Sequence, residues 1–430
     1  MAIALTRLAG TLRRPLVITL LASGTFQALS ILTGVVLART LGPGGRGELG
    51  TIVLWPNVWA ALMMLGLPDA ISVLTASRTM ATGDAVRSAL PVAAMLAVLG
   101  MVGAAAVEWL VLGDTDSATK LAAATFLVFI PLNMVTLIFL GALSGNRQFG
   151  ALNAVRVSVM VVAAVGLPLL AIGNRLTVTT AVATYLAANV VASSLSIGLV
   201  LRRPGSRMGR SSWSSGRRLV DFGARSHAGA VAGLLGERLD QLAISVFLLP
   251  GAFGLYLAAV TLCAGAGLIA STMATVLLPT IAAMAPELRL AAVRRYLKIT
   301  VLLTTGYVLI MTLLAPAILR VFFGSAFEAA TDVARILLIG TVPVTLSRAM
   351  AAASRASGLP GRASRAEWLA LACAAPAYVI LILRFGVVGA AWAFVIAGMA
   401  SFGFQAIAAR SSLGAVSVLD LVRSNAPETR

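Results

Sequence analysis

Long apolar stretches alternate with short polar segments along the whole 430-residue chain. Most of the stretches hold about 20 residues, the length of α-helix that crosses the hydrocarbon core of a bilayer. A backbone in contact with lipid must satisfy its hydrogen bonds internally, so each stretch is expected to form an α-helix. The pattern therefore predicts an all-α polytopic membrane protein with about twelve transmembrane helices. They are expected over 16–38, 49–76, 89–112, 119–143, 152–173, 178–201, 219–248, 253–282, 297–319, 334–357, 367–384 and 387–409.

Charged residues are distributed unevenly between the predicted loops. The chain has 33 Lys and Arg against 15 Asp and Glu, a formal net charge of +18. When the N-terminus is placed in the cytoplasm, most of the basic residues fall in the inner loops and tails. The outer loops, which include Arg46 and Glu108, hold similar numbers of bases and acids. This positive-inside bias predicts a multi-pass protein of the bacterial inner membrane with both termini in the cytoplasm. Its basic loops are expected to contact anionic membrane lipids, not nucleic acid.

A basic linker divides the predicted helices into two sets of six. The linker covers 202–218 and is rich in Arg, Ser and Gly, a composition typical of linkers. Similar turns, Pro43–Gly47 and Pro250–Gly254, follow the first helix of each half. Because each half has an even number of helices, the halves are expected to share one orientation and a pseudo-two-fold axis along the membrane normal. The expected parts are an N-terminal lobe over 1–201, the linker, a C-terminal lobe over 219–410 and a cytoplasmic tail over 411–430.

Five ionisable residues lie well inside the predicted spans, in the part expected to face hydrocarbon, where a charge costs about 2.5–3.5 kcal/mol on insertion scales. Glu237 and Asp240 are three residues apart and share one helix face, and Arg225 continues this face toward the cytoplasm. Two interpretations stay open. The charges could form ion pairs that lock helices together. They could also line a polar cleft that binds a charged substrate headgroup, with the acids taking part in ion coupling. The five residues are Asp69, Glu237, Arg238, Asp240 and Arg348.

Several classes of function are disfavoured by what the sequence lacks. The glycine-rich stretch Gly42–Glu48 has no Lys-Ser/Thr pair of a phosphate-binding loop. His227 is the one histidine, and Cys263 and Cys373 fall within predicted spans, where they behave as small apolar residues. No outer loop is long enough to form a catalytic domain. We therefore expect no enzyme, no cofactor and no metal, and a process driven by ion gradients, the membrane potential or substrate supply.

Short motifs in several helices resemble the polysaccharide (Wzx-type) flippases of the MOP superfamily, which also contains the MATE exporters and the lipid II flippases. The motifs occur in the family's order and at plausible spacing over nearly the whole chain. They are Leu37–Gly50, Gly66–Ala70, Glu237–Gln241 with Gly254–Ala259, Phe323-Gly324 with Phe327, Arg335–Leu338 and Gly389–Ala393.

The resemblance implies two six-helix lobes that work by alternating access. It implies that an oligosaccharide linked to undecaprenyl pyrophosphate moves from the inner to the outer leaflet for polysaccharide biosynthesis. Arginines in the cleft of such flippases contact the phosphates or the sugar, which points to Arg225, Arg238 and Arg348 here. The expected partners are the lipid-linked oligosaccharide, membrane lipids, and a polysaccharide polymerase or glycosyltransferases.

Two other functions stay open. One is a MATE-like, cation-coupled antiporter of small molecules. MATE exporters often carry an acid in their first helix, and this chain has none between Pro15 and Ala38. The other is a scaffold that recruits envelope-building enzymes and transports nothing. Lipid II flippases have fourteen helices, so a count of twelve favours the Wzx-like branch.

Overall fold

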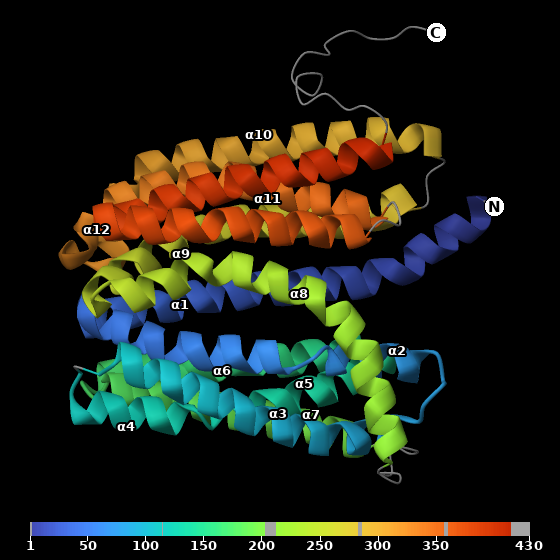
Figure 1. Ribbon diagram of the computed structural model, residues 1–430, viewed down its shortest axis with the longest axis horizontal. Helices are drawn as coiled ribbons and strands as arrows, with labels where there is room; N and C mark the ends of the chain where they lie inside the picture. Colours follow the sequence, from blue (N-terminus) through green and yellow to red (C-terminus); the bar gives the residue numbers. More distant parts are fainter. Residues whose placement is uncertain (1, 114, 203–211, 283–285, 357–359, 414–430) are drawn as a thin grey trace, which may run out of the picture. The chain divides into compact units, whose positions relative to one another are not determined.

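The computed structural model describes residues 2–113, 115–202, 212–282, 286–356 and 360–413, and all regular structure in these residues is helical (Figure 1). The all-α fold predicted from the apolar pattern is thus confirmed. The elements are α1 (Ala2–Met63), α2 (Leu67–Ala76), α3 (Thr82–Val111), α4 (Ser117–Phe126), α5 (Phe129–Gly145), α6 (Phe149–Ile172), α7 (Val178–Leu201), α8 (Trp213–Phe247), α9 (Pro250–Ala282), α10 (Pro286–Ile318), the π-helical turn η1 (Leu319–Phe323), the 3-10 helix η2 (Ser325–Ala330), α11 (Thr331–Ala356) and α12 (Pro360–Leu413).

Nine helical segments of the described residues are long and apolar enough to cross a membrane. Two of them lie in α1 and α12 and run for 40 and 49 residues, and each contains a kink between two helices. The 35-residue helix α8 is not among the nine, because charged residues interrupt its apolar character. The twelve predicted spans fall two each on the segments of α1 and α12, one on each of the other seven segments, and one on α8.

The turn expected after the first span is a kink at one residue inside α1. Gly42 has φ 67° and ψ −176°, a conformation open mainly to glycine. Pro43 follows and can begin the next helical segment, since the first residues of a helix need no N–H hydrogen bond. Pro250 begins α9 in the same way. Gly386, with φ 59°, makes the corresponding kink in α12. These two kinks join predicted spans that we expected to be separated by loops.

The chain forms two compact units, Met1–Val231 and Ala232–Arg430, called here the N-terminal unit and the C-terminal unit. The boundary between them falls inside α8. Most of the predicted linker and of the predicted tail lies outside the described residues.

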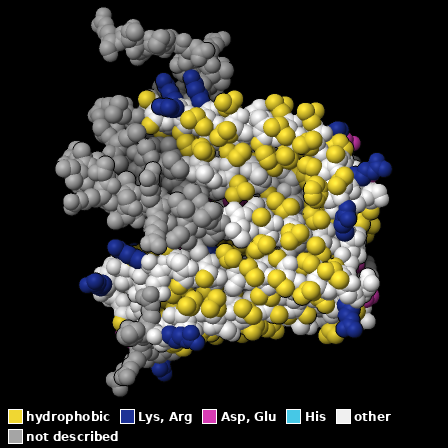
Figure 2. Space-filling model, turned by 180° about the vertical axis from the view of Figure 1, so that it is seen from behind, with side chains coloured by type: hydrophobic (Ala, Val, Ile, Leu, Met, Phe, Trp, Pro, Cys, Tyr) yellow, Lys and Arg dark blue, Asp and Glu magenta, His cyan; other side chains and the backbone are white. Residues whose placement is uncertain are grey.

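Apolar side chains cover much of the outer surface of the helices, and Lys and Arg side chains gather at the helix ends (Figure 2). In α3, for example, Val102, Trp109 and Leu110 are exposed, and in α10 Leu302 and Leu313 are exposed. Such a continuous apolar surface requires lipid around it. The chain is therefore a multi-pass membrane protein.

In the N-terminal unit, helix α2 is held by close backbone contacts. Gly141 and Gly145 of α5 are four residues apart and lie against α2. A Cβ on Gly141 would lie 2.5 Å from the carbonyl oxygen of Pro68, and one on Gly145 would lie 2.8 Å from that of Ser72. Small residues at this spacing allow membrane helices to approach closely. These contacts fix α2, and with it Asp69, within the unit.

The first half of α8 packs against the break between α1 and α2. Gly66 has φ 66°, and a Cβ there would lie 2.4 Å from the carbonyl oxygen of Gly223. The His227 ring lies with Nε2 3.0 Å from the carbonyl oxygen of Leu62, near the end of α1. The break in the second span thus receives both a backbone contact and a side-chain hydrogen bond from α8.

Alanine in place of Gly66 is expected to lower the free energy of unfolding by about 1–3 kcal/mol, because it adds both a strained φ and a backbone clash. The measurement is the midpoint of thermal unfolding in detergent. Gly150→Ala is the matched control, since nothing lies within 4 Å of its Cβ position. Equal midpoints for the two variants would contradict the close contact.

In the C-terminal unit, α11 packs against α9, α10 and α12. The polar side chains of α11 consequently meet three other helices rather than lipid alone. This central position of α11 brings the charges described below together.

Candidate functional site

Asp240 lies on the second half of α8 and is buried, with 4% of its surface exposed. The fully buried Tyr256 of α9 donates a hydrogen bond from its hydroxyl to Oδ2 of Asp240, at 2.8 Å. The other carboxylate oxygen, Oδ1, is buried and has no hydrogen-bond partner among the described residues. A buried polar atom of this kind costs about 1–3 kcal/mol. The carboxyl group is therefore half satisfied, and it has one oxygen left that could bind a proton or a cation.

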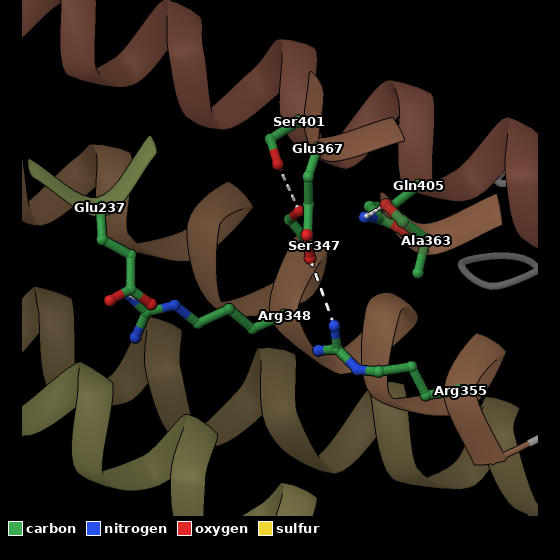
Figure 3. A network of polar contacts seen from close by, with 8 residues as sticks. All are labelled: Glu237, Ser347, Arg348, Arg355, Ala363, Glu367, Ser401 and Gln405. Carbon is green, nitrogen blue, oxygen red and sulfur yellow. Dashed lines mark hydrogen bonds and ion pairs between the residues drawn. The ribbon is translucent and has the colours of Figure 1, made fainter. Parts of the chain in front are cut away.

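Glu237 and Arg348 form an ion pair between α8 and α11. The Arg348 Nη2 atom lies 3.0 Å from Glu237 Oε1, and the two side chains are 46% and 57% exposed (Figure 3). Although Glu237 is three residues from Asp240, the two carboxylates meet different helices. The shared helix face expected from the sequence is thus divided between an accessible acid and a buried one.

A second ion pair joins α11 to α12. Arg355 Nη1 lies 3.3 Å from Glu367 Oε1, and the side chains are 46% and 20% exposed (Figure 3). Neither residue was predicted from the sequence, because both lie near predicted span ends, where charges are common. The spacing was an available signal: Arg355 follows Arg348 by seven residues, which is two helical turns on one face.

The two ion pairs are neighbours, and we call Glu237, Arg348, Arg355 and Glu367 the charged cluster. A Cβ on Gly233 of α8, one turn before Glu237, would lie 3.9 Å from Glu367 Oε2. Glu367 is also within electrostatic range of Glu237. Helices α8, α11 and α12 thus bring together two acids and two bases whose formal charges cancel.

Uncharged hydrogen bonds next to the charged cluster hold α11 and α12 together. The hydroxyls of Ser347 and Ser401 lie 2.6 Å apart. The buried Gln405 donates from Nε2 to the carbonyl oxygen of Ala363, at 3.0 Å (Figure 3). These contacts join the two segments of α12 to each other and to α11, so they fix the positions of Arg348, one residue after Ser347, and of Glu367.

Arg238 lies on α8 with Glu237 and Asp240, but its hydrogen-bond partner is an uncharged side chain. Its Nη1 atom donates to the side-chain amide oxygen of Gln241, at 3.1 Å. The side chain is exposed, and it forms no ion pair with another described residue. Its positive charge is therefore hydrogen bonded without being paired.

Asp69 and Arg225 belong to the N-terminal unit. Asp69 lies in the first turn of α2, and Arg225 lies on the first half of α8; both side chains are exposed. No hydrogen bond or ion pair joins either one to another described residue. Of the six residues singled out from the sequence, four (Glu237, Arg238, Asp240 and Arg348) belong to the C-terminal unit and two to the N-terminal unit.

Two charged residues assigned to outer loops from the sequence are buried in the N-terminal unit. Arg46 is 8% exposed and donates from Nη1 to the carbonyl oxygen of Gly34, at 2.7 Å. This hydrogen bond joins the two sides of the kink at Gly42. Glu108 is 4% exposed within α3, and its Oε1 atom has no hydrogen-bond partner among the described residues. Both residues lie inside helices and not in loops: α1 continues through the expected loop over 39–48 that contains Arg46, and Glu108 lies within α3, before its end at Val111.

A family model described as "Polysaccharide biosynthesis protein" matches residues 12–285. A comparison with curated proteins finds no match. Among solved structures, the chain is similar to the lipid II flippase MurJ in an inward closed conformation, with a TM-score of 0.78 and 15% identity over 94% of this chain and 88% of that one.

Two further solved structures extend the likeness. An inward-facing multidrug resistance MATE family transporter of the MOP superfamily has a TM-score of 0.75 and 14% identity, over 93% of this chain and 96% of that one. A MOP superfamily transporter from Pyrococcus furiosus has a TM-score of 0.60 and 14% identity, over 96% of each chain. At these identities the likeness establishes a shared fold. The fold and the family resemblance expected from the sequence motifs are confirmed.

Proposed function

The chain belongs to the polysaccharide biosynthesis protein family, and from this membership we propose that it is a flippase for a lipid-linked oligosaccharide. The substrate is an oligosaccharide carried on undecaprenyl pyrophosphate, moved from the inner to the outer leaflet by alternating access of the two units. A glycan with a charged pyrophosphate cannot cross hydrocarbon unaided, because unpaired polar and charged groups are costly there. The protein supplies a polar path for the head, while the polyprenyl chain stays in lipid.

The observation that carries this proposal is the accessibility of the charged cluster on membrane-spanning helices. Polar contacts between helices can be sealed from solvent, as the hydrogen bond between Asp240 and Tyr256 is. Glu237, Arg348 and Arg355 remain about half exposed. Charges that lie on helices expected to span the membrane and that stay accessible favour a surface that meets a polar substrate.

The residues take different roles in this proposal. Arg225, Arg238 and Arg348 contact the phosphates or the sugar, and Asp69 and Glu237 complete the polar surface. Asp240 takes part in ion coupling, because its second carboxylate oxygen is free for a proton or cation. The membrane potential adds to the driving force, since an anion that leaves a negative interior gains about 2.3 kcal/mol per charge per 100 mV.

The proposed location is the bacterial inner membrane, with both termini in the cytoplasm and the basic loops against anionic lipid. There the substrate would be delivered by glycosyltransferases on the inner face and consumed by a polymerase on the outer face. The proposed lobes over 1–201 and 219–410, with the linker over 202–218 between them, differ from the two compact units in residues 219–231, within the first part of α8.

Deletion of the gene is expected to cause one polyprenyl-linked saccharide to accumulate, because synthesis continues while transfer to the outer leaflet stops. Mass spectrometry of lipid extracts measures this and identifies the glycan. The gene restored on a plasmid is the control and should remove the accumulated lipid. Altered sensitivity to toxic cations with a normal lipid profile would contradict the proposal and support a MATE-like antiporter. A normal profile with unchanged sensitivity would support a scaffold.

A further inference from the structure

Each arginine of the charged cluster already has a carboxylate partner. Arg348 meets Glu237 at 3.0 Å, and Arg355 meets Glu367 at 3.3 Å. An anionic group that approached either guanidinium would compete with this carboxylate and would be repelled by it. The cluster is therefore poorly suited to pyrophosphate, although it contains two arginines. Arg238, which is hydrogen bonded to a neutral amide, is better suited to that role.

The pairs nevertheless keep hydrogen-bonding capacity after they bind each other. A guanidinium has five N–H donors and a carboxylate accepts at two oxygens. One contact between them therefore leaves other donors of the arginine and acceptors of the carboxylate free. Sugar hydroxyl groups both donate and accept hydrogen bonds, as all hydroxyls do. A surface of alternating guanidinium and carboxylate groups can satisfy both functions of neighbouring hydroxyls without requiring a charge on the ligand.

There is also room beside the cluster. A Cβ on Gly233 would have only Glu367 Oε2 within 4 Å, and a Cβ on Gly236, next to Glu237, would have nothing within 4 Å. The glycines of α8 thus leave the backbone uncovered next to Glu237 and Glu367. A sugar ring could approach the carboxylates from this side.

We propose that the charged cluster is a subsite for an uncharged, hydroxyl-rich sugar unit of the transported glycan, and that Glu237 and Glu367 exclude acidic sugars. This inference rests on the proposed flippase function, and it assigns binding of the substrate's glycan to the C-terminal unit. Arg355 and Glu367 become specificity-determining residues. The carboxylates act against the wrong substrate by charge repulsion, a common basis of selectivity.

The test measures binding of three probes to the full-length protein in lipid nanodiscs by native mass spectrometry. The first probe is undecaprenyl pyrophosphate alone. The second carries a neutral dihexose on the same lipid, and the third carries the same disaccharide with its terminal hexose oxidised to a hexuronic acid. We expect wild type to bind the neutral-glycan probe about tenfold more tightly than either of the other two, because the bare lipid lacks the hydrogen bonds of the sugar and the carboxylates repel the acidic sugar.

The double variant Glu237→Gln with Glu367→Gln keeps the side-chain shapes and removes both negative charges. It is expected to bind the hexuronic acid probe about tenfold more tightly than wild type does, so that the preference for the neutral probe disappears. The single variant Glu367→Gln, expected to shift the preference in the same direction, serves if the double variant does not fold. The control is Glu328→Gln with Asp332→Asn, which removes two acids from the exposed ion pairs with Arg320 and Arg335 and should change no affinity.

Three results would overturn the assignment, and they are distinguishable. Equal affinity of wild type for the bare lipid and the neutral-glycan probe would remove the sugar subsite and leave the proposed function standing. An unchanged preference in both glutamine variants would place the selectivity elsewhere in the chain. Failure of folded wild type to bind any of the three lipids would remove the proposed flippase function, and the subsite with it.

Discussion

Asparagine in place of Asp240 is expected to reduce export at least about tenfold while leaving the protein as stable as wild type or more stable. The amide oxygen can still accept the hydrogen bond from Tyr256, but the side chain can no longer take up or release a proton. A buried neutral amide also costs less than a buried carboxylate that has an unpartnered oxygen. Surface polysaccharide in a complemented deletion strain measures export, and thermal unfolding in detergent measures stability.

Tyr256→Phe is the matched variant for this site, because it removes the hydroxyl that donates to Asp240 at 2.8 Å and leaves the carboxyl group in place. It should destabilise the protein by about 1–3 kcal/mol, since a second carboxylate oxygen loses its partner. Dissipating the ion gradient should lower export in wild type and have no further effect on Asp240→Asn. Wild-type export in Asp240→Asn, still sensitive to the gradient, would exclude Asp240 from coupling.

Glutamate in place of Arg348 is expected to lower export by about 30-fold or more, because it replaces a donor to the substrate with a charge that faces Glu237. The effect on the free energy of unfolding should be much smaller, about 1 kcal/mol or less, because a half-exposed ion pair contributes little to stability. Export and thermal unfolding are measured as before. A large loss of export with a small loss of stability is expected of a substrate contact.

The exchanged pair, Glu237→Arg with Arg348→Glu, distinguishes an ion pair that only joins α8 to α11 from one that binds the substrate. It restores an ion pair between α8 and α11 and should recover the stability of wild type, yet export should remain low because donors and acceptors have changed places. The corresponding exchange of Arg320 and Glu328, an exposed pair at 3.1 Å, should leave export unchanged. Full recovery of export in the first exchange would reduce the Glu237–Arg348 pair to a clamp between helices.

Much of the fold could be predicted from the sequence because lipid imposes a simple pattern on the chain. The stretches expected over 152–173 and 178–201 correspond closely to α6 and α7. The kinks at Gly42 and Gly386 could not be predicted. Each depends on one residue with positive φ, and in a chain with 40 glycines such a residue resembles those that only allow close packing.

The sequence predicted most of the charged residues of the site, but it did not predict which residues contact one another. Charges in the middle of apolar stretches identified Glu237, Asp240 and Arg348. Which of them is buried depends on neighbouring helices: Tyr256 of α9 encloses Asp240, while α11 offers Glu237 an accessible arginine. Glu367 was missed because its importance arises only when α12 packs beside α8 and α11, and the position near the end of a span gives no sign of this.

The interface between α2 and α5 limits how the N-terminal unit can change shape. Gly141 and Gly145 meet the α2 backbone with no room for a single methyl group, so neither helix can slide along the other without collision. Asp69 therefore keeps a fixed position within the N-terminal unit. If transport exposes Asp69 to one side of the membrane and then to the other, the whole N-terminal unit must rotate as a rigid body, and the Asp69 carboxylate moves with it.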